Sequence, residues 1–292
     1  MSHDDLFRTY DDGTMKTIAL VCPFAQFGSP GAAEGAELLA DAIREMLDDN
    51  RRERRPTRGR AYQPHVRIKE LEFADLAAVG AWRETARTAA KQALAGSEFL
   101  LWIGGNHLSA LPVYEELGAL DNSLVIQLDA HLDLYNLSDN PPELNHGNFL
   151  RHSAGPLPAL VNVGHRDLFL PEKSIRQFYQ ATFPASVLAL NPALAVAAVR
   201  DLSRQADRVF LDIDCDVLDP AFFPATTHPL PFGLAPLLLL HFIDAAWGDN
   251  LCGVSVSEFD PGRDRTDQSL STLVWLVEYL LLKRYEPGTS HP

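Results

Sequence analysis

Short apolar runs alternate with amphipathic segments along most of the chain. Runs whose length predicts buried strands lie at 17–22, 66–73, 98–105, 125–128, 160–167, 208–214 and 251–260. Between them, apolar residues recur at helical spacing and predict helices at 33–49, 81–96, 106–120, 172–180, 192–205, 234–248 and 267–286. A further apolar segment, 186–191, lies between two of these helices. Strands and helices thus alternate about seven or eight times.

Most of the predicted strands are apolar on both faces, which is typical of a parallel sheet covered by helices on both sides. The predicted fold is therefore α/β, with three α/β/α layers and a mostly parallel central sheet. No internal repeat or linker divides the pattern, so residues 16–286 are expected to form a single domain, preceded by an irregular arm (1–15) and followed by a tail (287–292). In open parallel sheets the ligand site lies beyond the carboxyl ends of the strands.

The net charge of the chain indicates which kinds of partner are unfavourable. With 25 basic and 39 acidic residues the net charge is −14, which argues against nucleic acid or an anionic membrane as a partner. The three cysteines have no spacing that suggests a zinc site or a disulfide framework, and no segment resembles a signal peptide or a membrane span. We therefore expect a cytoplasmic protein, and whether copies of it associate stays open. Six arginines between residues 51 and 60 form either a solvated loop or a docking patch for an acidic partner.

Polar residues that follow the predicted strands supply the candidate chemistry. The run 125–128 leads into Asp129, His131 and Asp133, whose side chains alternate along the chain and can converge on one point. A strand tip that caps a helix would explain one such group. However, Asp214 and Asp216 repeat the same design at the end of another strand.

His107, in the glycine turn after the strand at 98–105, completes a set of four carboxylates and two imidazoles. One cation does not need that many protein ligands, whereas two neighbouring cations would use them with some carboxylates bridging. Two cations about 3.5–4 Å apart can hold a bridging hydroxide as a nucleophile at neutral pH. Oxygen-rich ligation with some imidazole favours manganese over zinc.

The motifs around these residues resemble those of the ureohydrolase superfamily of arginases and agmatinases. The family's Gly-Gly-Asp-His-Ser reads "GGNHLS" here, Asp-Ala-His-x-Asp reads "DAHLD", and Ser-x-Asp-x-Asp-x-x-Asp-Pro reads "DIDCDVLDP". Glu-x-Asn-Pro becomes "EFDP", and the family's His-Gly loop reads "HGNF". The motifs occur in the family's order, and the resemblance covers roughly residues 17–285.

The resemblance implies a hydrolase that uses two manganese ions to cleave a guanidino or amidino C–N bond, releasing urea and an amine. One ion would be held by His107, Asp129, Asp133 and Asp214. The other would be held by Asp129, His131, Asp214 and Asp216. Glu258 would pair with the guanidinium, His146 would shuttle a proton, and Asp133 is expected to serve catalysis as well as metal binding.

Two departures from the family pattern lie beside the expected ligands. Asn106 replaces the Asp that precedes the metal histidine, which removes a charge that could orient a ligand. Asp212 replaces the Ser two residues before Asp214. Its carboxylate either lies behind the ligands as a second acidic group or points to the other face of the sheet.

A third departure concerns the substrate. In arginases a second Asp in Gly-x-Arg-Asp-x-Asp holds the α-ammonium of the amino acid, whereas "GHRDLF" keeps Asp167 but has Phe169 at that place. A buried ammonium without a partner costs desolvation, so free arginine is expected to be a poor substrate. Asn148, His165, Asp167 and Phe169 are expected to contact the substrate alongside Glu258. The substrate is then another small guanidino compound or the arginine side chain of a peptide.

Two readings from other mechanistic classes remain. The same fold supports single-zinc deacetylases, although Glu258 would have no obvious task in amide hydrolysis. A binding scaffold without catalysis is the other reading, although a decayed site rarely keeps every ligand.

Overall fold

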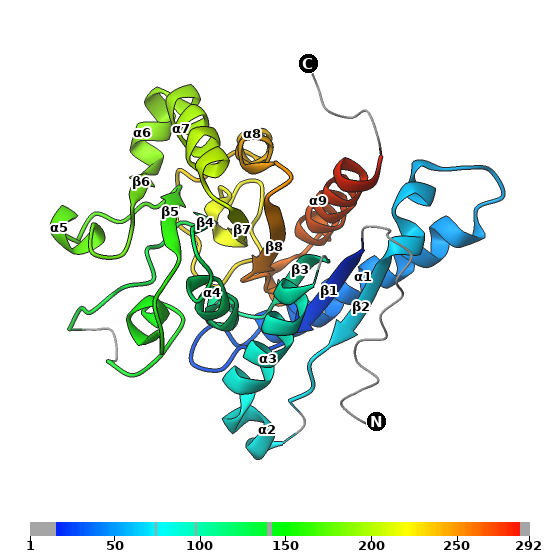
Figure 1. The fold of residues 1–292 in the computed structure, drawn as a ribbon, viewed down its shortest axis with the longest axis horizontal. Coiled ribbons are helices and arrows are strands. Elements are labelled where there is room, and N and C mark those ends of the chain that lie inside the picture. Colours follow the sequence, from blue (N-terminus) through cyan, green and yellow to red (C-terminus); the bar gives the residue numbers. More distant parts are fainter. Residues whose placement is uncertain (1–15, 74, 97, 139–141, 287–292) are drawn as a thin grey trace.

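Eight parallel strands form the centre of the protein. The computed structural model describes residues 16–73, 75–96, 98–138 and 142–286 (Figure 1). The strands are β1 (Thr17–Cys22), β2 (Val66–Glu70), β3 (Phe99–Gly104), β4 (Ser123–Leu128), β5 (Ala159–Val163), β6 (Ala181–Phe183), β7 (Arg208–Asp214) and β8 (Leu251–Ser257). They pair in the order β2-β1-β3-β8-β7-β4-β5-β6, and every pairing is parallel.

Helices cover both faces of this sheet. They are α1 (Ala32–Arg52), α2 (Leu76–Gly80), α3 (Trp82–Ala95), α4 (Leu111–Gly118), α5 (Glu172–Ile175), α6 (Ala185–Leu190), α7 (Pro192–Gln205), α8 (Pro236–Ala246) and α9 (Gln268–Tyr285). The helices α1 and α9 lie side by side on one face, and α3 and α4 lie side by side on the other (Figure 1). The α/β class and the three layers predicted from the sequence are confirmed.

The two faces of the sheet belong to two separate hydrophobic clusters. In β3, Leu101 and Ile103 pack with α1, α8 and α9, whereas Leu100 and Trp102 pack with α3 and α4. Successive side chains of a strand point to opposite faces, so a strand between two helical layers must be apolar at every position. This is why the sequence shows continuous apolar runs rather than an alternation.

The largest departure from the predicted elements lies at 172–190. The helix expected over 172–180 ends at Ile175, a short strand (β6) follows, and the segment 186–191 is mostly helical as part of α6. Tyr179 explains the early end, because its hydroxyl is buried and bonded to the Gln127 side chain (2.5 Å) and the Leu132 carbonyl (2.8 Å). These bonds draw the chain onto the sheet, where β6 pairs with β5. The predicted arm (1–15) and tail (287–292) lie outside the described residues.

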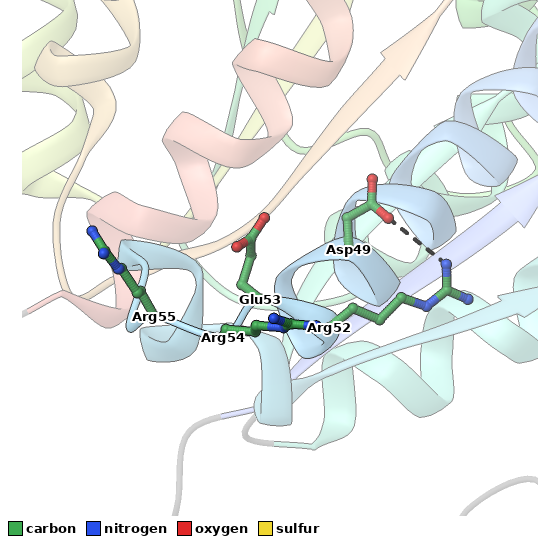
Figure 2. Close-up of a pocket in the computed structure, with 5 residues that line it drawn as sticks. All are labelled: Asp49, Arg52, Glu53, Arg54 and Arg55. Carbon is green, nitrogen blue, oxygen red and sulfur yellow. Dashed lines mark ion pairs between the residues drawn. The ribbon is translucent and has the colours of Figure 1, made fainter.

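The arginine-rich segment lies at the end of α1 that points away from the carboxyl ends of the strands. Helix α1 follows β1 and returns the chain to the amino ends over 21 residues, which is roughly 30 Å. Several of the arginines have partners within the chain, such as Arg52 with Asp49 (3.9 Å) and Arg58 with Glu286. The segment borders an open hollow lined by Asp49, Arg52, Glu53, Arg54 and Arg55 (Figure 2). These internal pairs favour the solvated loop, and the docking patch stays a hypothesis.

Helix α1 also presses against the backbone that follows β8. A Cβ atom on Gly35 would lie 1.8 Å from the carbonyl oxygen of Phe259, a separation that requires glycine at this position. Phe259 directly follows Glu258, so the helix supports the position of that carboxylate.

We expect Gly35→Ala to destabilise the protein by about 1–3 kcal/mol, because the added methyl group forces α1 away from the backbone of Phe259. Gly80→Ala is the matched control, since nothing lies within 4 Å of a Cβ at that helical position. Urea denaturation of both variants measures the difference. Equal stabilities of the two variants would contradict the close approach.

Candidate active site

The four central strands each end in polar residues. In the order of the sheet, β3, β8, β7 and β4 are neighbours, although β3 and β8 are far apart in the sequence. His107 follows β3, Glu258 follows β8, Asp214 ends β7, and Asp129 follows β4. Parallel strands end at the same edge, so the sheet order brings these side chains together.

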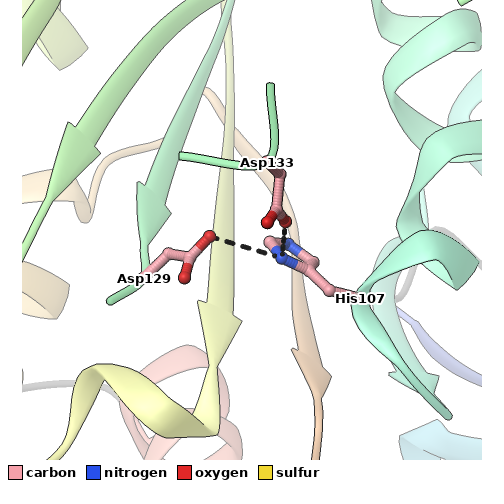
Figure 3. Close-up of side chains that lie close together, drawn as sticks. All are labelled: His107, Asp129 and Asp133. Atoms are coloured by element: carbon pink, nitrogen blue, oxygen red, sulfur yellow. Dashed lines mark ion pairs between the residues drawn. The ribbon is translucent and has the colours of Figure 1, made fainter. Parts of the chain in front are cut away.

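His107 faces three carboxylates through one ring nitrogen. Its Nδ1 lies 2.7 Å from Asp133 Oδ2, 3.2 Å from Asp214 Oδ2 and 3.4 Å from Asp129 Oδ2. Figure 3 shows Asp129 and Asp133 converging on the ring of His107. The Nδ1 atom and the Oδ2 atoms of Asp129 and Asp133 are buried and make no hydrogen bond. Converging donor atoms of this kind fit a divalent cation.

A second group of ligands adjoins the first. His131 Nδ1 lies 2.8 Å from Asp216 Oδ2 and 3.8 Å from Asp129 Oδ1. Candidate ligand atoms of His131, Asp129 and Asp216 therefore form one cluster, and those of His107, Asp129 and Asp133 form another. Asp129 belongs to both and presents a different oxygen to each histidine, as a bridging carboxylate would.

The carboxylates at this site need a counter-charge. Burial and the neighbouring Asp133 raise the pKa of Asp129 from 3.8 to about 7. Burial and the neighbouring Asp216 and Asp129 likewise raise the pKa of Asp214 well above its ordinary value. The cost of ionising all of them together falls when divalent cations lie between them.

Asp212 lies behind His107 and is fully buried. It is on the same face of β7 as Asp214, and its Oδ2 lies 2.6 Å from His107 Nε2 and accepts a bond from the Tyr114 hydroxyl (2.5 Å). Its other oxygen accepts a hydrogen bond from Ser255. Burial would raise the pKa of Asp212, but the charge and hydrogen bond of His107 outweigh burial and lower it. A carboxylate at Nε2 directs the Nδ1 lone pair toward the ligand cluster. The two readings of Asp212 are thereby resolved in favour of the contact with His107.

Asn106, the other departure, is also buried and has a different task. Its side-chain amide donates to the Gln26 carbonyl (3.0 Å) and so fastens the loop after β1 to the turn after β3.

Glu258 connects the candidate metal ligands with His146. Its Oε1 accepts the backbone N–H of His107 (2.9 Å) and lies 3.2 Å from His146 Nδ1. Burial disfavours a charged imidazole, but the hydrogen bond and charge of Glu258 outweigh burial and raise the pKa of His146 above 6.5. Glu258 and Asp133 both have left-handed backbone, with φ of 65° and 48°. Such residues cost about 1–3 kcal/mol each and gather at functional sites.

All the candidate ligands except Asp129, together with Glu258, line one cavity of about 160 Å³. Its lining residues are His107, His131, Asp133, Tyr135, His146, Gly147, Asp214, Asp216, His228 and Glu258. Tyr135 and His228 were not predicted as site residues. Tyr135 continues the alternation of Asp129, His131 and Asp133, and that register could have revealed it. His228 lies in a proline-rich loop whose path has no sequence signal.

Four residues expected to contact the substrate lie outside the cavity lining. Asn148 is buried and holds its own loop through the backbone of Asn145 and Glu143. His165 is buried, and burial lowers its pKa. One oxygen of Asp167 accepts the backbone N–H groups of residues 169 and 170 (3.0 and 2.8 Å). The Phe169 ring is 79% exposed.

Comparison with known proteins gives a single family. The family model described as "Arginase family" matches residues 17–283. The chain is 30% identical over 188 residues to a guanidinopropionase of Pseudomonas aeruginosa, covering 60% of this chain and 57% of that protein. It is 29% identical over 181 residues to the mitochondrial arginase 1 of Arabidopsis thaliana (57% and 49% covered), and 27% identical over 193 residues to an agmatinase of Halalkalibacterium halodurans (65% of each). The matches thus span about half to two thirds of these relatives.

Solved structures show the same fold. An arginase from Bacillus subtilis superposes with a TM-score of 0.73 at 23% identity, over 91% of this chain and 98% of that one. Proclavaminate amidino hydrolase from Streptomyces clavuligerus gives a TM-score of 0.73 at 23% identity, over 92% and 91% of the chains. The predicted arginase-like architecture is confirmed. In the part of the chain that the structure describes, no helix has the length and apolar character to cross a membrane.

We expect Asp212→Asn to weaken the binding of Mn²⁺ by about 10- to 100-fold, because an amide no longer fixes the tautomer of His107 as a carboxylate does. Calorimetric titration of the metal-free protein with Mn²⁺ measures the change. Asp244→Asn, on the surface of α8, is the control. Unchanged affinity in Asp212→Asn would show that the contact with His107 is only structural.

Proposed function

Because the chain belongs to the Arginase family, we propose that it is a binuclear manganese hydrolase that cleaves a guanidino C–N bond to give urea and an amine. The observation that carries this proposal is the position of Asp129, which belongs to two adjacent ligand groups and presents one oxygen to each. A shared carboxylate is expected of a two-ion site and not of a single-zinc deacetylase.

The residues at the site fit two ions. His107, Asp133 and Asp214 would hold one with Asp129, and His131 and Asp216 would hold the other with Asp129 and Asp214. When bound, the ions would supply positive charge and lower the pKa of water, so that a nucleophile forms at neutral pH. Glu258 lines the same cavity outside this ligand set, so its negative charge stays available for a cationic substrate.

Glu258 is the proposed partner of the guanidinium. It is buried beside the ligands, and a carboxylate can accept two parallel N–H bonds from a planar cation. The hydrogen bond from the His107 backbone fixes its position before the substrate arrives. This arrangement would orient the guanidinium carbon toward the ligand cluster.

His146 is the proposed proton carrier. It lines the cavity beside Glu258, and its raised pKa keeps the imidazole protonated to a higher pH than a free histidine. A protonated imidazole at this place can deliver a proton to the leaving amine, which needs one as the C–N bond breaks.

The relatives and the residues near the cavity support a class of substrate. Relatives named guanidinopropionase, agmatinase and arginase suggest a guanidinium joined to a short chain. Phe169, in the place of the second Asp, offers no partner for an α-ammonium, which supports the expectation that free arginine is a poor substrate. An arginine within a peptide has neither the α-ammonium nor the α-carboxylate of free arginine. Its side chain is therefore an alternative substrate.

The test is urea release with added Mn²⁺ from agmatine, 3-guanidinopropionate, guanidine, L-arginine and an arginine-containing peptide. We expect urea from at least one compound and less from arginine than from the best substrate. Asp129→Ala should release none and should hold one ion or fewer, because the bridge between the two ligand groups is lost. Two tightly held ions in Asp129→Ala, or an active enzyme with one zinc, would overturn the assignment.

We expect His146→Asn to keep both ions but to lower turnover by about 10²- to 10⁴-fold, the range for an acid–base group. In the wild type, turnover should fall as the pH rises through the pKa of His146, which lies above 6.5 because of Glu258. The variant should lack this fall. A pH–rate profile shared by both proteins would show that His146 carries no proton in the rate-limiting step.

A further inference from the structure

Four large, exposed apolar side chains lie on loops whose backbones contact residues of the site. Phe27 is 57% exposed, Leu168 91%, Phe169 79% and Phe232 82%. We call these four residues the apolar rim. They come from three loops that follow β1, β5 and β7, and each loop is fastened to residues of the site.

Phe27 is joined directly to the cavity. Its carbonyl accepts the backbone N–H of His146 (3.1 Å), and a Cβ on the next residue, Gly28, would lie 2.7 Å from the His146 ring. The backbone of Phe27 is left-handed, with φ of 60°, which is unusual for a bulky residue. The loop therefore holds this phenyl ring outward at a conformational cost.

Leu168 and Phe169 lie on a turn that the site also holds in place. The N–H of Arg166 donates to the Ala130 carbonyl (2.8 Å), between the ligands Asp129 and His131. The guanidinium of Arg166 donates to the Asp216 and Leu230 carbonyls (2.7 and 2.9 Å), so it ties this turn to the loop after β7. These bonds keep the turn from folding back to bury its apolar side chains.

Phe232 is held by the same loop after β7. It lies four residues beyond His228 of the cavity lining, and the next residue, Gly233, donates its N–H to Asp219 (2.9 Å). Its backbone is also left-handed, with φ of 64°. Two exposed phenylalanines with this backbone thus lie on loops that contact or contain residues of the cavity lining.

We propose that the apolar rim binds the uncharged, apolar chain of a small guanidino substrate whose guanidinium occupies the cavity. This inference rests on the proposed function and names the substrate class. Glu258 lines the cavity outside the proposed ligand set and matches a cationic head, whereas the rim side chains offer no partner for a second charge. The cavity of about 160 Å³ is below the roughly 300–1,000 Å³ of sites that enclose a drug-sized ligand, and the part of a chain that does not fit in it would continue over the rim.

The experiment measures binding of ethyl-, butyl- and hexylguanidine to the manganese-loaded protein by calorimetry. Each added methylene that the rim covers should tighten binding by about three- to fourfold. Agmatine, which resembles butylguanidine but ends in an ammonium, should bind at least tenfold more weakly than butylguanidine. The double variant Phe169→Ser, Phe232→Ser should lose the dependence on chain length but bind guanidine as the wild type does.

Leu190→Ser is the matched control, because Leu190 is an 88% exposed leucine on α6, outside the three loops that carry the apolar rim. It should behave as the wild type. Equal affinity for all three alkylguanidines, or a double variant with the wild-type dependence, would overturn the proposal. An arginine peptide with apolar neighbours is included as a further ligand. If this peptide binds more than tenfold tighter than hexylguanidine, the rim binds a polypeptide and the proposal of a small substrate is wrong.

Urea release from the same compounds separates this inference from the proposed function. If affinity depends on chain length but no compound yields urea, the inference about the apolar rim is supported and the proposed hydrolase activity is wrong. If urea release is the same in the wild type and in the double variant for every chain length, the hydrolase activity is supported and the inference about the apolar rim is wrong.

Discussion

The arrangement of this protein depends on the repulsion among buried carboxylates at the carboxyl edge of the sheet. Asp129, Asp133, Asp214 and Asp216 lie within one small region, and burial and mutual charge raise the pKa of two of them. Such a group is unfavourable unless positive charge is placed among the carboxylates. The histidines supply part of that charge when protonated, so protons and metal ions compete for the same nitrogen atoms.

The rest of the fold holds these groups in place against their repulsion. Strands apolar on both faces fix the sheet between two layers of helices, and the order of the central strands decides which side chains meet. Strain is tolerated at the same edge, since Asp133, Glu258 and two phenylalanines of the apolar rim have left-handed backbone. The energy stored there is small beside the burial that stabilises the sheet.

The sequence was sufficient for features that depend on local pattern. Apolar runs predicted seven of the strands, and the alternation in "DAHLD" predicted which side chains share a direction. Features that depend on distant contacts were not accessible in this way. The strand β6 forms because Tyr179 is drawn to Gln127, and the direction of Asp212 is decided by His107 and Tyr114 on other elements. The positions of Asn148 and His228 depend on loop paths, for which a single sequence has no periodic signal.

His107 has one further consequence through its two kinds of contact. Its ring faces the carboxylate cluster, while its backbone N–H holds Glu258, the proposed partner of the guanidinium. A shift of this residue on metal binding would therefore be transmitted to the carboxylate that is the proposed partner of the substrate. Thermodynamic reciprocity then applies: by whatever factor the cations raise the affinity for a guanidinium ligand, that ligand raises the affinity for the cations. The affinity for the cations and the affinity for the substrate would thus change together, by the same coupling free energy.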